Sequence, residues 1–398
     1  MIVVIISDWF SEGMGYAENH LPAFLAREGA EVHVVSSDLQ IYATDQALYS
    51  KVYEPNLGPP IVPCGVKKIN GFTLHRLSNY RTPYGIGITA LKETLARIKP
   101  DIVYLFEIAA ETTLQAIACK KELGYKLFTE SRMHRSVFTP PSTLYQRLKY
   151  YFSIKRKWRK AGEAFEKCYP VAPDVLEMIC KYLGQEERKC ELSSLAVDTT
   201  LFVPPVSPDQ LAERKKRRKE LGFSDPDIVC IYTGRFNDDK GPLILARAIG
   251  MLHAQGHQGF KALFIGAGEE SYIESMKEQK GCVVHPFVPS AELVKYYQAA
   301  DIGVWPKQES TSQLDAAACG LPLILSSRVA DTARIEGNGL SYEHESYEDL
   351  AARIRSLEAL PVRKQLGNYG VDKIQKLYSW KYIARKRLLD FEKALACI

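Results

Sequence analysis

The chain has 398 residues, of which 46% are hydrophobic and 25% charged, and its formal net charge is +5. This length predicts two domains with a core each, and the mild charge does not by itself indicate nucleic acid. No stretch approaches the roughly 20 apolar residues of a membrane-spanning helix. The short apolar start, 2–6, lacks the basic flank of a signal peptide. We therefore expect a cytoplasmic protein that touches a membrane at most from outside.

Nine cysteines are scattered along the chain without the spacing of a zinc site. They are Cys64, Cys119, Cys168, Cys180, Cys190, Cys230, Cys282, Cys319 and Cys397. Their odd number and scattered positions predict small core residues in a reducing compartment, not disulfides. We expect neither a metal nor a cofactor.

The chain begins with a pattern typical of a βαβ unit. A buried strand over 2–6 is followed by a loop with Gly13 and Gly15, a helix over 17–28 and a strand over 31–36. Glycines in the first turn of such a unit let peptide N–H groups approach an anion. The same glycines could instead serve the turn alone.

The rest of the first half continues the alternation after a proline-containing excursion over 39–70. Strands and helices are expected at 72–77, 87–98, 100–106, 111–123 and 126–130, with short strands at 168–172 and 190–195. A polar cluster with Glu130, Arg132 and His134 stands at the end of the fourth buried strand. Because carboxyl ends of parallel strands share one edge of a sheet, we expect this cluster at a ligand-binding edge.

A basic stretch over 147–160 interleaves seven cations with aromatic residues. As a helix it would place Leu144, Leu148, Tyr151 and Phe152 on one side. That pattern is typical of an interfacial helix on anionic lipid. The alternative is a helix that faces the core with a solvated basic back, and nucleic acid is disfavoured because no binding module accompanies the stretch.

The second half follows a proline-dense stretch at 203–208, where we place the domain boundary. A run of cations at 214–219 is expected to be a solvated helix face, and the Asp225-Pro226-Asp227 segment a turn. Strands at 228–232, 262–268, 283–284, 301–305 and 323–325 alternate with helices, and a final helix covers 380–396. This alternation predicts mainly parallel sheets in both halves.

The strand at 228–232 leads into a tight polar loop that carries Arg235 and Lys240. Open α/β sheets bind ligands at the carboxyl ends of their strands. A planar guanidinium and a compact ammonium together suit the oxygens of a diphosphate. Two solvated loop cations are the alternative interpretation.

Several segments together resemble the retaining glycosyltransferases of the GT-B fold, specifically glycosyltransferase family 4, over essentially the full chain. They are Gly13-Met14-Gly15, 25–32, 195–204, 233–235 with 240–241, 265–268, and 300–302 through 315–322. The resemblance implies an α/β protein with two Rossmann-like domains that face each other across a cleft. The implied domains are 1–205 for the acceptor, 206–375 for the nucleotide-sugar donor, and a C-terminal helix, 376–398, that packs back on the first domain.

The resemblance also implies roles for individual residues. In the family, an arginine and a lysine of the strand-loop motif clamp the donor diphosphate, which assigns that role to Arg235 and Lys240. The implied donor site further includes four glycines, Gly13, Gly15, Gly234 and Gly268. Acceptor-side candidates are Glu130, Arg132 and His134. His134 could orient a group or accept a proton, since an unperturbed histidine has a pKa near neutrality, or be an ordinary loop histidine.

The family's acidic motif places two glutamates eight positions apart. Here the second falls on Asp315, which is implied to bind the ribose, and the first falls on Lys307. A shortened loop leaves Glu309 as the implied stand-in near the transferred sugar. Groups for the diphosphate would come from Ser310, Thr311 and Ser312. The same segment also fits a capping box from Ser312 to Asp315, which is compatible with an anion site at a helix N-terminus.

The implied function is retaining, metal-independent transfer of a sugar from a nucleoside diphosphate to a glycan or lipid-linked acceptor, in surface polysaccharide or glycoconjugate synthesis. The expected partners are this donor and this acceptor, with no nucleic acid, and the interfacial-helix interpretation of 147–160 adds peripheral contact with an anionic membrane. Two alternatives remain. One is a nucleotide-sugar epimerase or hydrolase, and the other is a non-catalytic GT-B subunit that binds sugar or a partner enzyme.

Overall fold

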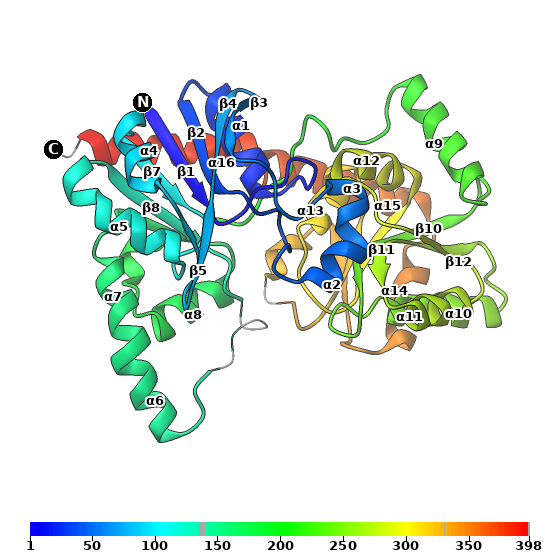
Figure 1. Cartoon of the computed structure of the whole chain (residues 1–398). Coiled ribbons are helices and arrows are strands. Elements are labelled where there is room, and N and C mark those ends of the chain that lie inside the picture. The colour runs from blue at the N-terminus through cyan, green and yellow to red at the C-terminus, as the bar shows by residue number, and fades with distance from the viewer. Residues whose placement is uncertain (135–137, 139, 330, 397–398) are drawn as a thin grey trace. The chain divides into compact units, whose positions relative to one another are not determined.

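The structure is a computed structural model, and it describes residues 1–134, 138, 140–329 and 331–396. The chain divides into two compact units. Unit 1 comprises Met1–Leu195 with Ile383–Ile398, and unit 2 comprises Ala196–Tyr382 (Figure 1). The division therefore falls before the proline-dense stretch at 203–208, where the sequence predicted it.

Unit 1 is built on a 7-stranded sheet of order β3-β4-β2-β1-β7-β8-β9. Its strands are β1 (Ile2–Ser7), β2 (Glu31–Ser37), β3 (Gly65–Ile69), β4 (Phe72–Leu77), β7 (Ile102–Leu105), β8 (Lys126–Ser131) and β9 (Lys167–Pro170). All neighbours are parallel except β3 and β4. The predicted parallel sheet is confirmed, and a separate hairpin of β5 (Asn79–Thr82) and β6 (Gly85–Ile88) was not predicted.

The helices of unit 1 connect these strands. They are α1 (Ala17–Arg27), α2 (Gln46–Leu48), α3 (Glu54–Leu57), α4 (Leu91–Ile98), α5 (Glu111–Leu123), α6 (Leu144–Tyr150), α7 (Arg156–Gly162), α8 (Pro173–Tyr182) and α16 (Trp380–Ala396). Two π-helical segments, Tyr49–Tyr53 and Tyr151–Lys155, lie between them. The excursion at 39–70 is therefore not irregular, since it holds α2, α3 and β3.

The C-terminal helix α16 joins unit 1 at Ile383. Phe391 lies edge-on against Phe128 of β8, with ring centroids 4.7 Å apart. The Tyr169 hydroxyl donates to Asp390 at 2.8 Å. Burial of such aromatic side chains is a large favourable contribution, so residues far apart in sequence complete one core.

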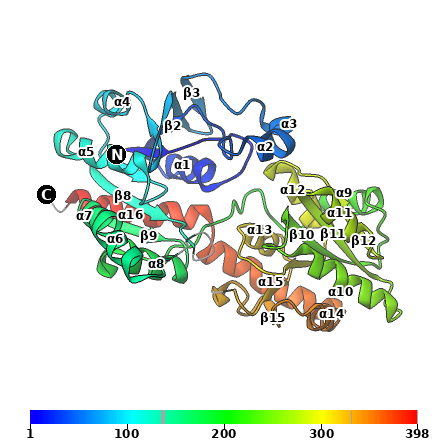
Figure 2. The ribbon, with the colours of Figure 1, turned by 60° about the horizontal axis from the view of Figure 1, so that its bottom comes forward.

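Unit 2 is built on a fully parallel 6-stranded sheet of order β12-β11-β10-β13-β14-β15. Its strands are β10 (Ile228–Phe236), β11 (Phe260–Gly268), β12 (Cys282–His285), β13 (Ile302–Trp305), β14 (Leu323–Ser326) and β15 (Gly339–Tyr342). Its helices are α9 (Pro208–Glu220), α10 (Pro242–Ala254), α11 (Glu270–Lys277), α12 (Ser290–Ala299), α13 (Ser312–Ala318), α14 (Tyr347–Ser356) and α15 (Leu360–Leu377). Figure 2 shows α10 beside α14.

Three sequence predictions need correction. Strand β10 continues to Phe236 instead of ending at 232, because it pairs with β11 along its full length. The cation run in α9 is only partly solvated: Arg218 is 2% exposed and donates to four oxygens, including that of Asp301 at 3.0 Å. Cys64 is exposed, whereas four other cysteines are buried, and Cys397 lies outside the described residues.

Candidate functional site

The carboxyl end of β10 is fixed by hydrogen bonds from its neighbours. The Trp305 indole N–H donates to the backbone oxygen of Thr233 at 3.1 Å. The Thr233 hydroxyl and the Tyr297 hydroxyl are 2.7 Å apart. All three side chains are buried. These buried hydrogen bonds fix the end of the strand and therefore the position of the residues that follow Thr233.

Glycines let β10 and β11 approach each other closely at this end. Gly234 is paired with Gly266, and Phe236 with Gly268. A Cβ on Gly266 would clash with the carbonyl oxygen of Gly234, and one on Gly268 with that of Phe236. The packing of the two strands therefore explains why Gly268 is a glycine, whatever ligand it meets.

Arg235 is the second-last residue of β10, and Lys240 lies in the loop that follows the strand. Arg235 is exposed and Lys240 is half-buried. Burial lowers the pKa of Lys240, and the nearby Arg235 guanidinium lowers it further. The carboxylates of Asp239 and Glu309 have the opposite effect and raise this pKa, but by less. Within the described part of the chain, neither cation forms an ion pair with a carboxylate. The two cations therefore form a positive site that an anionic ligand could neutralise.

The loop after β13 carries Glu309 and is held from behind by Arg334. The buried Arg334 guanidinium donates to the Ser310 carbonyl and to Gln313, each at 3.1 Å, and pairs with Asp331 at 3.0 Å. Glu309 accepts from the Asp331 backbone N–H at 3.1 Å. Arg334 was not predicted from the sequence, because two of its three partners, Ser310 and Gln313, lie more than 20 residues earlier and local patterns do not show such contacts.

The predicted capping box from Ser312 to Asp315 is absent. Helix α13 begins at Ser312, and its N-cap is Thr311, which makes no side-chain capping hydrogen bond. The Ser310 hydroxyl instead accepts from the Ser312 backbone N–H at 3.3 Å. Ser310, Thr311 and Ser312 are all half-buried, and their donor contacts remain predictions.

Asp315 lies one turn into α13 and is half-buried. Burial raises the pKa of its carboxyl group to about 8, with a further contribution from Asp198. No hydrogen bond from the described residues reaches this carboxyl group. Within the described residues, the Asp315 carboxyl group therefore has no hydrogen-bond partner. This is the state expected of a group that binds the hydroxyl groups of a ligand.

Lys307, at the position of the family's first acidic residue, is not free. Its ammonium pairs with Glu345 at 2.6 Å. Its aliphatic stem lies over Gly241, where a Cβ would approach Lys307 Cγ to 2.9 Å. The cation therefore sits beside the Lys240 loop but is neutralised by its own partner.

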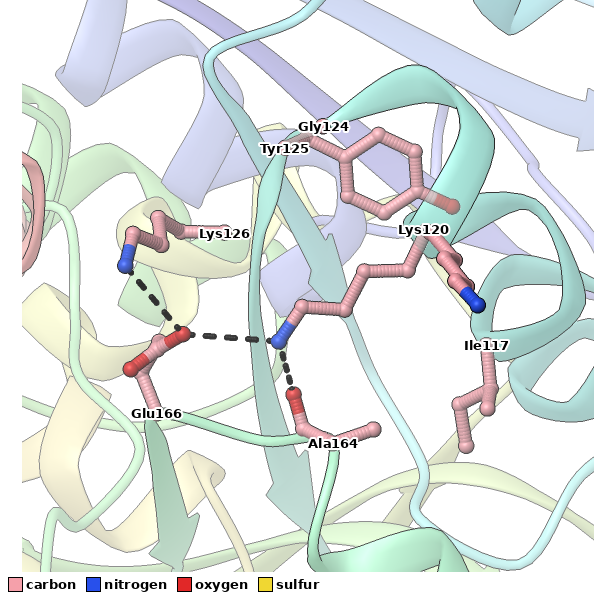
Figure 3. Close-up of a pocket in the computed structure, with 8 residues that line it drawn as sticks. Ile117, Lys120, Gly124, Tyr125, Lys126, Ala164 and Glu166 are labelled. Atoms are coloured by element: carbon pink, nitrogen blue, oxygen red, sulfur yellow. Dashed lines mark hydrogen bonds and ion pairs between the residues drawn. The ribbon is translucent and has the colours of Figure 1, made fainter. Parts of the chain in front are cut away.

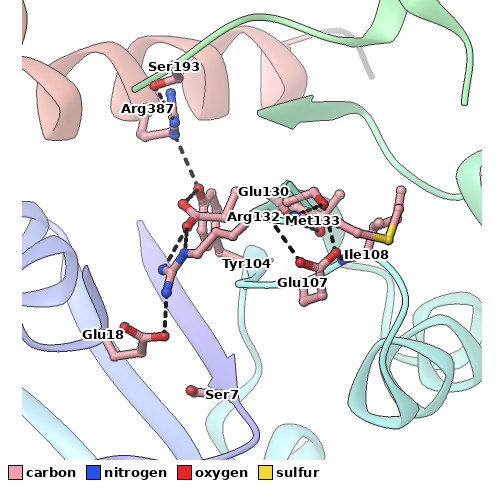
Figure 4. A network of polar contacts seen from close by, with 12 residues as sticks. Ser7, Glu18, Tyr104, Glu107, Ile108, Glu130, Arg132, Met133, Ser193 and Arg387 are labelled. Atoms are coloured by element: carbon pink, nitrogen blue, oxygen red, sulfur yellow. Dashed lines mark hydrogen bonds and ion pairs between the residues drawn. The ribbon is translucent and has the colours of Figure 1, made fainter. Parts of the chain in front are cut away.

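In unit 1, Glu130 and Arg132 belong to a buried ion-pair network (Figure 4). The Arg132 guanidinium pairs with Glu130 at 2.7 Å and with Glu18 at 2.8 Å. Glu130 also accepts from the Tyr104 hydroxyl at 2.7 Å. This geometry engages both side chains in holding β8 to α1, which argues against the acceptor-side role predicted for them.

Two further acids that the sequence analysis did not single out line the same sheet edge. Burial raises the pKa of Glu107, which accepts from the Ser131 hydroxyl and from the Arg132 and Ile108 backbone N–H groups. Burial also raises the pKa of Asp8, to about 6, although a hydrogen bond from Thr112 opposes this. Asp8 directly follows β1. This position at the carboxyl end of a strand was the sequence signal by which it could have been predicted as a site residue.

His134 is oriented by a carboxylate. Its Nδ1 atom lies 3.2 Å from both oxygens of Asp174, at the start of α8. Such a partner fixes the orientation of an imidazole ring. The His134 backbone N–H donates to the Arg132 carbonyl at 2.8 Å, so the residue adjoins the Glu130–Arg132 network through its main chain.

Gly13 and Gly15 lie in the loop after β1. Gly13 is exposed and lies beside Leu57 of α3, and Gly15 has a φ of +65°. Together with the excursion at 56–63, the loop lines a pocket of about 400 Å³. Arg76 also lines it and is 6% exposed. Its Nη1 has no hydrogen-bond partner, whereas Nη2 donates to the Phe10 carbonyl at 2.8 Å.

A second pocket of unit 1, of about 470 Å³, lies between α5 and the segment before β9 (Figure 3). Glu166 lies between Lys120, at 3.4 Å, and Lys126, at 3.8 Å. The Lys120 ammonium also donates to the Ala164 carbonyl. The internal pairing of these charges indicates a structural tie between the two segments.

With the geometry in place, the chain can be compared with known proteins. Residues 213–373 match the family described as glycosyl transferases group 1. This part of the chain is therefore similar to glycosyl transferases group 1. It contains the cations of the β10 loop, the acidic loop and Asp315.

Curated relatives are similar over part of the chain. A D-inositol 3-phosphate glycosyltransferase of Segniliparus rotundus is 26% identical over 54% of this chain and 50% of its own length. Spore coat protein SA of Bacillus subtilis is 27% identical over 50% of this chain and 57% of its own. The chain thus spans about half the length of the curated relatives that it matches.

Solved structures share the fold over the full chain. Sucrose-phosphate synthase from Thermosynechococcus elongatus aligns over 100% of both chains with a TM-score of 0.70 and 16% identity. Anabaena HepE in complex with UDP aligns over 100% of both chains, with a TM-score of 0.69 and 15% identity. The chain therefore has the GT-B fold, as the resemblance implied. Within the described residues, no helix has the length and apolar character needed to cross a bilayer.

Proposed function

We propose that the protein is a retaining, metal-independent glycosyltransferase that moves a hexose from a nucleoside diphosphate to a glycan or lipid-linked acceptor in polysaccharide or glycoconjugate synthesis. In this proposal unit 2 binds the donor and unit 1 binds the acceptor. The observation that carries it is the pair Arg235 and Lys240 at the end of the central strand β10, which forms no ion pair with a carboxylate of the described residues.

The relatives support the donor class. Solved GT-B structures of the same fold include HepE with UDP-glucose and Arabidopsis starch synthase IV with ADP. A D-inositol 3-phosphate glycosyltransferase is among the similar curated proteins. A nucleoside diphosphate sugar is therefore the donor class proposed for this chain.

The proposed chemistry uses the two cations on the leaving group. The bond between the anomeric carbon and the diphosphate oxygen breaks through an oxocarbenium-like state. The acceptor hydroxyl oxygen bonds to the anomeric carbon on the same face, and its proton passes to the departing diphosphate. Fixed positive charge from Arg235 and Lys240 stabilises this developing negative charge more than the ground state.

Asp315 and Glu309 are proposed to hold the rest of the donor. The carboxyl group of Asp315 lacks an internal partner and would accept or donate a hydrogen bond to the ribose hydroxyls. Glu309 is held near Lys240 by the Asp331 backbone. Its proposed role is contact with the transferred sugar.

The pocket lined by Gly13 and Arg76 is the proposed acceptor subsite. The Arg76 Nη1 atom is a buried donor without a hydrogen-bond partner in the described residues, and an oxygen atom of a ligand could accept its hydrogen bond. This assignment replaces Glu130 and Arg132, which form ion pairs with each other and, for Arg132, with Glu18. His134 stays a candidate for orienting the acceptor.

The proposal is tested by incubating the protein with radiolabelled UDP-, GDP- and ADP-hexoses and a panel of lipid-linked and oligosaccharide acceptors. The expected product is a glycoside whose anomeric configuration equals that of the donor, formed equally well with a chelator present. Free sugar or an epimer as the product would instead support a hydrolase or epimerase. Donor binding without turnover on any acceptor would support a non-catalytic subunit.

A further inference from the structure

Helix α6 and the π-helical segment after it present an apolar face to solvent. The exposed fractions are 75% for Leu144, 74% for Tyr145, 52% for Leu148, 47% for Tyr151 and 64% for Phe152. Leu144, Leu148 and Phe152 are four residues apart and therefore lie on one side of the helix. Large apolar side chains gathered in this way mark an interaction surface.

The same helical stretch faces the core of unit 1 with different residues. Trp158 is 2% exposed, Ile154 packs on the apolar core, and Tyr150 lies against Tyr182 of α8. The predicted alternative, a helix that faces the core with a solvated basic back, is therefore correct in part: the helix faces the core, but not through Leu144, Leu148, Tyr151 and Phe152. One face of the helical stretch packs on the core of unit 1, and a second apolar face of the same stretch is exposed to solvent. Figure 1 shows α6 extending away from the sheet of unit 1.

Cations surround this second face and are not neutralised by the protein. The stretch carries Arg147, Lys149, Lys155, Arg156, Lys157, Arg159 and Lys160. Within the described residues none of them forms an ion pair, although Lys157 lies 3.3 Å over the Tyr84 ring. Exposed apolar side chains flanked by free cations complement a surface that is negative outside and apolar beneath.

We propose that the face formed by Leu144, Tyr145, Leu148, Tyr151 and Phe152, with its flanking cations, docks the protein on an anionic lipid bilayer. The apolar side chains enter the boundary between headgroups and acyl chains, and the cations contact lipid phosphates. The helix lies in the plane of the surface, in agreement with its short length. This proposal is independent of sugar transfer, because it concerns a surface outside the donor and acceptor sites.

The test is flotation of the full-length protein with vesicles of phosphatidylcholine alone or mixed with phosphatidylglycerol, without donor or acceptor. We expect binding to the mixed vesicles, weakened by salt. The variants Leu148→Ser/Phe152→Ser and Lys149→Glu/Arg156→Glu should each lower the partition coefficient at least about tenfold. All four side chains are exposed, so the melting temperature should stay unchanged.

Matched controls come from the basic helix α9 and the residues before it. Val206→Ser/Leu211→Ser removes exposed apolar side chains, and Lys215→Glu/Lys216→Glu removes exposed charges. Both should bind vesicles like the wild type. Equal losses in test and control variants, or no preference for anionic vesicles, would overturn the proposal. The proposal would also be overturned if the protein did not bind vesicles but used this face to self-associate or to bind RNA.

Discussion

Lys240 shares its surroundings with Arg235: burial lowers the pKa of the Lys240 ammonium, and the neighbouring guanidinium lowers it further. Two like charges are placed together at the end of β10, and within the described residues neither forms an ion pair with a carboxylate, although Asp239 and Glu309 partly offset the lowering of the Lys240 pKa. Such an arrangement costs stability in the free protein and is offset when an anion binds. The pair is therefore better explained by a ligand than by folding.

Arg235→Ala and Lys240→Ala should each lower kcat by about 10²–10³, because each removes a preorganised charge from the leaving group. Unfolding by denaturant should show no loss of stability, since a repulsive pair is relieved. The matched control is Arg247→Ala, which removes an exposed cation from α10. Variants that raise only the donor KM and keep kcat would show that the pair binds the ground state and the transition state equally well.

Asp315 should make stability depend on pH. Its folded pKa of about 8 lies above the ordinary 3.8, so the native state holds this proton while the unfolded state has lost it. The resulting stabilisation is present at low pH and is lost as pH rises toward 8. Asp315→Asn should therefore gain about 1–2 kcal/mol relative to the wild type between about pH 5 and pH 9. Urea unfolding measures this, with the exposed Asp225→Asn as the control that should show no such trend.

Arg334 should be the residue that holds the acidic loop. Its guanidinium is buried and joins Asp331, Gln313 and the Ser310 carbonyl, so Arg334→Ala removes this donor from a half-buried carboxylate and a half-buried carbonyl. We expect a loss of about 3 kcal/mol in unfolding free energy and a raised donor KM. Arg353→Ala breaks an exposed arginine–aspartate pair and should cost at most about 0.5 kcal/mol. Similar losses in the two variants would contradict the assignment.

Gly266 should tolerate no side chain. A Cβ there would clash with the Gly234 carbonyl oxygen, and Gly266→Ala should destabilise unit 2 by about 2 kcal/mol or more. Gly259 has open space around its Cβ position and ordinary backbone geometry. Gly259→Ala should therefore leave the melting temperature nearly unchanged, and an equal effect at both positions would refute the close-approach argument.

Much of the fold could be predicted from local patterns. The buried strands at the starts of both units, the glycine loop after β1 and the parallel sheets follow from runs of apolar residues between turn residues. The β5–β6 hairpin and the elements within 39–70 were missed. Their strands are short and partly exposed, so they carry little of the hydrophobic periodicity on which such predictions depend.

The candidate site was predicted unevenly. Arg235 and Lys240 were found because both belong to one strand-loop segment. Arg334 and Arg76 were not, since all but one of their hydrogen-bond partners are distant in sequence and a buried arginine has no local signature. Glu130 and Arg132 were expected at an open edge, but Tyr104, Glu18 and α1 enclose them.

The sequence alone determined the order of strands and helices, the position of two cations after a buried strand and the basic, aromatic composition of 147–160. These features depend on residues that are close together in the sequence, so the periodicity of apolar and polar side chains predicts them. Only the tertiary structure decided which charges are neutralised and which apolar faces are covered. Burial and pairing depend on residues that folding brings together from distant parts of the chain, as it does for Arg132 with Glu18 and for Trp158 in the core.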